Sequence, residues 1–133
     1  MTNKYKYFIA NWKMFGGVKS VNLLNKVIKF SKLRKFKYAR IIYCPPYTLL
    51  HDFVLKTKKN TINIGAQNCH HSEIDGPFTG FINSKMIKKI GCKYVIIGHS
   101  ENRLTGENDV LLNRKIKSSL RNKLKIIFCI GET

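Results

Sequence analysis

The chain has 133 residues, of which 25 are Lys or Arg and 7 are Asp or Glu, so its formal net charge at pH 7 is +18. A hydrophobic fraction of 44% is typical of a folded globular domain and argues against a disordered chain. No apolar run approaches the roughly 18 residues that a membrane-spanning helix needs, and the N-terminal residues show no signal-peptide pattern. We therefore expect one modest domain that does not insert into a membrane. The four cysteines are scattered without a C-x-x-C pair, which favours free thiols and a reducing, cytoplasmic setting.

The excess of positive charge admits two functional interpretations. Basic proteins bind nucleic acid through its phosphates, and a positive field also draws in small anionic substrates. The lysines are spread along the whole chain, and no arginine-rich arm, zinc finger or aromatic platform accompanies them. Richness in Lys, Asn and Ile is typical of AT-rich coding sequence, so we attribute most of the charge to composition and a smaller part to anion steering.

Apolar runs predict five β-strands, and the segments between them have helical periodicity. The expected strands cover residues 5–10, 40–44, 61–66, 93–97 and 125–130. The expected helices cover residues 18–34, 47–56 and 84–90, with a fourth built on the stripe Leu112, Ile116 and Leu120. Strands that alternate with helices predict an α/β fold with a parallel sheet and right-handed crossovers.

The longest irregular segment spans residues 67–82 and contains Gly76-Pro77-Phe78-Thr79-Gly80. A long loop inside a compact domain is often functional, and its small and aromatic residues suit docking into a partner. A plain surface excursion is the alternative. Within this segment, Cys69, His70 and His71 are potential metal ligands, but no second ligand pair has zinc-like spacing. We therefore expect no metal.

Distinctive residues follow every predicted strand, and they meet at one edge of a parallel sheet, where α/β enzymes carry their active sites. The most informative ending is Gly98-His99-Ser100-Glu101, directly after a buried run. On this stretch alone, the alternative is a helix start with Ser100 as its N-cap. The other endings are Asn11-Trp12-Lys13, Cys44-Pro45-Pro46, Gln67-Asn68 and Gly131-Glu132-Thr133.

Six blocks in a shared order and spacing give the chain its resemblance to the triosephosphate isomerase family. They are Asn11-Trp12-Lys13-Met14, Cys44-Pro45-Pro46-Tyr47, Gly65-Ala66-Gln67-Asn68-Cys69, Gly76-Pro77-Phe78-Thr79-Gly80, Val95-Ile96-Ile97-Gly98-His99-Ser100-Glu101 and Cys129-Ile130-Gly131-Glu132-Thr133. The family fold is an eight-stranded (β/α) barrel of about 250 residues. The resemblance implies that residues 1–133 are the N-terminal portion of a single TIM-barrel domain, up to its fifth strand.

The resemblance also implies a reaction and a set of roles. The family interconverts dihydroxyacetone phosphate and glyceraldehyde 3-phosphate through an enediolate, without a cofactor, in glycolysis and gluconeogenesis. By resemblance, His99 is the electrophile that exchanges protons with the substrate oxygens, and Lys13 neutralises the phosphate and the developing oxyanion. Asn11 donates to the substrate oxygens, and Glu101 holds Lys13 in place. Two further residues, Phe78 and Thr79, resemble the loop tip that enters the other subunit of a homodimer.

Two departures from the family pattern limit these implications. The family's carbon base is a Glu after the sixth strand, followed by a mobile lid and phosphate-binding loops, and residues 1–133 contain none of them. We therefore expect an N-terminal fragment with negligible isomerase activity by itself. Phe81 and Asn102 stand where the family usually has Glu and Arg, which predicts a more apolar or weaker dimer contact. The alternative function is a non-catalytic basic βα module that binds nucleic acid.

Overall fold

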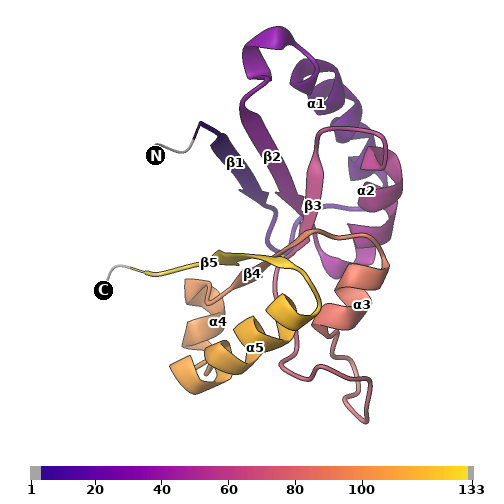
Figure 1. Ribbon diagram of the computed structural model, residues 1–133. Coiled ribbons are helices and arrows are strands. Elements are labelled where there is room, and N and C mark those ends of the chain that lie inside the picture. The colour runs from indigo at the N-terminus through magenta and orange to yellow at the C-terminus, as the bar shows by residue number, and fades with distance from the viewer. Residues whose placement is uncertain (1–3, 132–133) are drawn as a thin grey trace.

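The computed structural model describes residues 4–131 and shows a five-stranded parallel sheet that curves as half of a barrel (Figure 1). Its strands are β1 (Lys6–Asn11), β2 (Ala39–Cys44), β3 (Asn63–Ala66), β4 (Tyr94–Ile97) and β5 (Lys125–Phe128), and they neighbour one another in chain order. All five expected strands are confirmed, and so is their parallel pairing. The ending Glu132-Thr133 lies outside the described residues.

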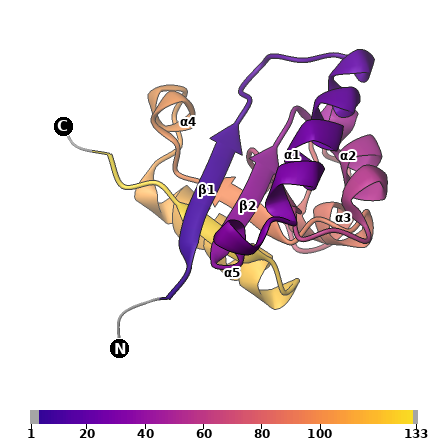
Figure 2. The same ribbon diagram turned by 90° about the horizontal axis from the view of Figure 1, so that it is seen from above.

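Helices join successive strands and cover one side of the sheet (Figure 2). They are α1 (Leu23–Ser31), α2 (Leu50–Thr57), α3 (Ser84–Lys89), the short α4 (Ser100–Leu104) and α5 (Asp109–Arg121). Asparagine side chains cap two of them: Asn83 accepts a hydrogen bond from the backbone of α3, and Asn108 accepts one from the backbone of α5, each at 2.9 Å. Gly91 follows α3 with a φ of 104°, a left-handed conformation that ends the helix within one residue of its expected end at residue 90.

Two expected helices begin later than the sequence pattern predicts, because tight i→i+3 turns precede them. The 3₁₀ turn Val18–Asn22 stands before α1, where Ser20 both donates to the Gly17 carbonyl at 2.8 Å and accepts from the Gly17 N–H at 3.0 Å. The 3₁₀ turn Tyr47–Leu49 stands before α2. A third such turn, Arg34–Phe36, separates α1 from β2. Apolar spacing does not distinguish the two helix types over a single turn.

The larger core lies between the sheet and the helices and is centred on fully buried side chains such as Phe53, Val95 and Leu112. A second, smaller cluster on the opposite face contains Ile42 and Ile96. Because successive strand residues point to opposite faces, β4, which lies between β3 and β5, contributes to both clusters and is buried along its whole length. The sheet is therefore covered on both faces only around its central strands.

The two outer strands expose large apolar side chains. On β1, Phe8 is 56% exposed and Tyr7 is 48% exposed, and on β5 Phe128 is 45% exposed. Within residues 4–131, β1 pairs only with β2 and β5 only with β4, so each leaves one row of backbone donors and acceptors unpaired. An open, apolar strand edge is a template for pairing with another chain.

We expect the 133-residue chain to self-associate as its concentration rises, through these edges. Replacing Phe8 by Lys places a charge on the β1 edge and should shift association to concentrations about tenfold higher, because a buried large apolar side chain contributes about 1.5–3 kcal/mol. Phe30→Lys is the matched control, since Phe30 on α1 is 59% exposed but lies away from a strand edge. Sedimentation velocity at several protein concentrations measures where association begins for each variant. Equal shifts for Phe8→Lys and Phe30→Lys would contradict pairing through the strand edge.

Candidate active site

The carboxyl ends of β1, β3 and β4 surround a cavity of about 540 Å³. It is lined by Asn11 and Lys13 from the end of β1, Gln67 from the end of β3, and His99 and Glu101 from the end of β4. These residues are up to 90 positions apart in sequence, and parallel pairing brings them to one rim. The structure thus gathers in one cavity four residues that the resemblance singles out, whereas Phe78 and Thr79 lie elsewhere.

The ammonium of Lys13 lies 2.8 Å from one carboxylate oxygen of Glu101. Both side chains are about half exposed, so solvent screens the pair, and its contribution to stability is small. The hydrogen bond from Lys13, more than its charge, lowers the pKa of the Glu101 carboxyl below its usual value. Glu101 therefore remains ionised at neutral pH, and it pairs with the amine in the lining of the cavity.

His99 is the N-cap of α4, and its ring is oriented by the helix that it begins. The backbone N–H of Glu101 donates to Nδ1 of His99 at 3.3 Å, so Nδ1 acts as an acceptor and the proton of a neutral ring lies on Nε2. The same Nδ1 also lies 3.5 Å from Glu101 Oε2, a contact that becomes an ion pair only when the ring is protonated. The N-cap of this helix is thus His99 and not Ser100.

Lys13 has a left-handed backbone, with a φ of 51° that side-chain-bearing residues rarely adopt. Its N–H donates to Oδ1 of Asn11 at 2.9 Å, which leaves the Asn11 amide hydrogens free for other partners. The preceding residue, Trp12, packs edge-on against Tyr43 and Phe53 at ring distances of 6.0 and 5.1 Å. Packing of the indole therefore fixes where the chain leaves β1.

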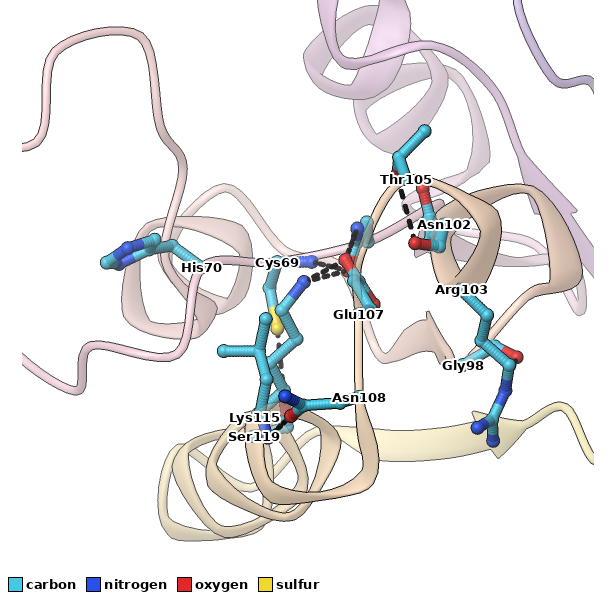
Figure 3. A network of polar contacts seen from close by, with 12 residues as sticks. Cys69, His70, Gly98, Asn102, Arg103, Thr105, Glu107, Asn108, Lys115 and Ser119 are labelled. Carbon is cyan, nitrogen blue, oxygen red and sulfur yellow. Dashed lines mark hydrogen bonds and ion pairs between the residues drawn. The ribbon is translucent and has the colours of Figure 1, made fainter.

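A second polar network lies deeper in the cavity wall and was not predicted from the sequence (Figure 3). Lys115 from α5 forms an ion pair with Glu107, and the exposed fractions of the two side chains are 7% and 11%. The Asn68 amide joins them, since its oxygen accepts from Lys115 at 2.9 Å and its nitrogen donates to Glu107 at 2.7 Å. Glu107 is therefore committed to a buried lysine, although it lines the same cavity.

The loop between β3 and α3 projects from the body of the molecule (Figure 1). Its base is closed by a hydrogen bond from the His70 N–H to the Ile82 carbonyl at 2.8 Å. The imidazole of His70 packs at a tilt against the rings of Phe78 and Phe81, at ring distances of 4.4 and 4.9 Å. Phe78 is 41% exposed and Phe81 63% exposed, so the tip presents an apolar surface, and Phe81 also lines the cavity.

A family model described as triosephosphate isomerase matches residues 6–133. The chain belongs to the triosephosphate isomerase family. It is 42% identical over 124 residues to the triosephosphate isomerase of Herpetosiphon aurantiacus, covering 92% of this chain and 49% of that protein. It is 40% identical over 125 residues to that of Aquifex aeolicus, again covering 92% of this chain and 49% of the relative.

A solved structure agrees with these sequence matches. The triosephosphate isomerase of Bartonella henselae superposes with a TM-score of 0.87 at 34% identity, covering 96% of this chain and 52% of that one. The chain therefore spans about half the length of the curated relatives that it matches. The expected α/β fold is confirmed, as part of a TIM barrel. Within residues 4–131, no helix is long and apolar enough to cross a membrane, and no three His, Cys, Asp or Glu residues are grouped as metal ligands.

Gly98, between β4 and His99, is required by both conformation and space. Its φ is 77°, and an added Cβ would lie 3.0 Å from the Arg103 guanidinium and 3.1 Å from the Cys129 carbonyl. The guanidinium cannot easily yield, because its Nε donates to the Gly98 carbonyl at 2.8 Å (Figure 3). Gly80, at the loop tip, has a φ of 79° but nothing within 4 Å of such a Cβ.

We expect Gly98→Ala to lower the free energy of unfolding by about 1–3 kcal/mol more than Gly80→Ala does. Both substitutions incur the cost of a left-handed alanine, about 1–2 kcal/mol, and only the first adds overpacking. Urea unfolding followed by Trp12 fluorescence, with all variants at one protein concentration, measures the difference. Equal losses would show that space around Gly98 is not limiting.

We expect Lys115→Met to destabilise the fold by about 3–5 kcal/mol, because it leaves the Glu107 carboxylate buried without its counter-charge. The double variant Lys115→Met/Glu107→Gln should recover at least half of this loss. Lys85→Met is the matched control: it removes the more exposed ion pair with Asp75, whose N–O distance is 3.1 Å, and should cost less than about 1 kcal/mol. The same urea titration compares all three, and a small loss for Lys115→Met would contradict the buried pair.

Proposed function

We propose that residues 1–133 are the N-terminal portion of a single TIM-barrel domain of a triosephosphate isomerase, which interconverts dihydroxyacetone phosphate and D-glyceraldehyde 3-phosphate in the cytoplasm. The observation that carries this proposal is the juxtaposition of Lys13, His99 and Glu101 in one cavity at the carboxyl ends of the strands, in a chain of this family. The cysteines within the described residues are all free, which suits a reducing compartment.

The site chemistry favours stabilisation of an enediolate. A neutral His99 with its proton on Nε2 can donate to one substrate oxygen and later recover a proton from the neighbouring one. The Lys13 ammonium supplies positive charge where the oxyanion and the phosphate would lie, and the Asn11 amide offers a further donor. Glu101 acts through Lys13, since its carboxylate holds the ammonium at 2.8 Å. No cofactor is needed for these steps.

The proton on carbon needs a carboxylate that this part of the chain does not offer. Within residues 4–131, the two carboxylates that line the cavity are Glu101 and Glu107, and each is paired with a lysine. By family resemblance, the base is a Glu after the sixth strand. We propose that the C-terminal half of a complete barrel supplies this Glu, and that the 133 residues alone have negligible isomerase turnover.

We also propose that the complete enzyme is a homodimer, with Phe78 and Thr79 at the tip that docks into the partner. The exposed apolar surface of this tip supports docking into a partner. Phe81 and Asn102, which stand where the family usually has the charged pair of the dimer contact, both line the cavity, so this contact would lie beside the site. With an aromatic ring and an amide where the family usually has opposite charges, the contact should depend little on salt. Nucleic acid binding stays the alternative, and it would weaken steeply with salt.

A chimera tests the proposed function: residues 1–133 followed by the remaining half of the Aquifex aeolicus relative. We expect no measurable isomerase turnover from the 133 residues alone and clear turnover from the chimera. His99→Gln and Lys13→Ala should each lower kcat of the chimera by about 100-fold or more, since each removes a group aimed at developing charge.

The matched controls replace the same residue types away from the cavity. His51 on α2 and Lys26 on α1 are exposed, so His51→Gln and Lys26→Ala should change kcat by less than about twofold. Full activity of the His99→Gln chimera would overturn the assigned role. Salt-dependent binding of a random oligonucleotide, combined with an inactive chimera, would favour the alternative.

A further inference from the structure

The amide of Gln67 joins the ends of three neighbouring strands. From the end of β3, its Nε2 donates to the carbonyl of Lys13 at 2.8 Å and to the carbonyl of Cys44, the last residue of β2, also at 2.8 Å. The same Cys44 carbonyl accepts from the backbone N–H of Trp12 at 3.1 Å. One side-chain amide therefore uses both of its hydrogens on backbone carbonyls around the Lys13 turn.

Lys13 needs such restraint, because its φ of 51° is unfavourable for a residue with a Cβ. Glycine would adopt this conformation freely, but it has no amine to offer to the cavity. The strain is therefore tolerated only while neighbouring groups hold the backbone in place.

Each polar group of Lys13 has a partner from a different part of the rim. Its N–H donates to Asn11 of β1 at 2.9 Å, its carbonyl accepts from Gln67, which directly follows β3, and its ammonium pairs with Glu101 of α4 at 2.8 Å. The Glu101 pair is half exposed and solvent-screened, so it fixes the amine weakly. The restraint from β3 acts on the backbone itself, where the unusual φ is set.

We propose that Gln67 is a positioning residue: its amide holds the left-handed backbone of Lys13 and thereby aims the ammonium into the cavity. The part of this inference that concerns catalysis rests on the proposed function, whereas the part that concerns the backbone does not. The proposed role also explains why a polar side chain, Gln67, directly follows β3, a position to which the sequence analysis assigns no role.

Amide hydrogen exchange of the 133-residue chain tests the backbone part without any need for activity. Gln67→Met preserves side-chain length and removes both donors, so exchange of the segment 11–17 should become about tenfold faster. Asn63→Leu, which removes an amide at the opposite end of β3, is the matched control and should leave that segment unchanged. Gln67→Ala serves as the second variant if Gln67→Met loosens every segment.

Glycine at position 13 provides the decisive rescue. In the double variant Gln67→Met/Lys13→Gly, the left-handed turn no longer needs a restraint, so exchange of the segment 11–17 should return to within about twofold of the Lys13→Gly variant alone. Unchanged exchange in Gln67→Met, or an equal acceleration with and without Lys13→Gly, would overturn the proposal, because the amide would then not act through this backbone.

The chimera tests the catalytic part. Gln67→Met should lower kcat/KM about tenfold in the parent chimera and by less than about twofold when Lys13 is already replaced by Ala, since Gln67 acts through the amine. Equal losses in both backgrounds would show a merely structural role and overturn the positioning. An inactive parent chimera would instead overturn the proposed function, and the exchange rescue would still decide whether Gln67 holds the backbone.

Discussion

Parallel pairing in strict chain order is the constraint on which the rest of the structure depends. Each helix returns the chain to the same end of the sheet, so Asn11 aligns with Cys44, and Ala66 aligns with Val95. Side chains that follow these strands therefore share one rim, although long segments separate them. A change in strand order or direction would separate Lys13 from Glu101, and no local interaction could compensate for it.

The same constraint explains why burial is so uneven. A curved parallel sheet has two covered faces only where helices lie outside it and neighbouring strands lie on both sides. The inner strand β4 meets both conditions and is fully buried, whereas the edge strand β1 exposes Tyr7, Phe8 and Ile9. His99 follows this buried strand, so packing on both faces of β4 fixes where its backbone lies. Lys13 follows an edge strand, so it depends more on specific hydrogen bonds.

Features set by periodicity and local chemistry could be predicted from the sequence. The five strands and the helix expected over residues 84–90 follow from apolar patterning and from the conformational preferences of single residues, whereas the choice of Asn83 over Ser84 as its N-cap needed the structure. The sequence pattern places the first residues of α1 and α2 too early, because a 3₁₀ turn has the same apolar spacing as an α-helix over a few residues. For α4 the sequence offers only the alternative of a helix start with Ser100 as its N-cap, since five residues are too few for a periodic signal.

Tertiary contacts account for what the sequence could not reveal at the site. Resemblance to a family pointed to Asn11, Lys13, His99 and Glu101, and the structure brings them into one cavity, while their roles stay proposals. The left-handed Lys13 and the Gln67 contacts depend on three strand ends meeting, which no single segment encodes. The only signal for Gln67 was its position after β3, a place where polar residues are exposed to a shared rim.

The scarcity of acids makes their placement informative. With 7 Asp and Glu against 25 Lys and Arg, a carboxylate that merely balances charge could lie almost anywhere. In the described part of the chain, Glu73, Asp75, Glu101, Glu107 and Asp109 each form an ion pair with a defined basic residue. Two of these pairs lie in the cavity wall, and in both the carboxylate is already committed to a lysine. Under the proposed isomerase function, a proton on carbon would leave to a carboxylate supplied by another part of a complete barrel, whereas the groups proposed to stabilise negative charge lie in the cavity described here.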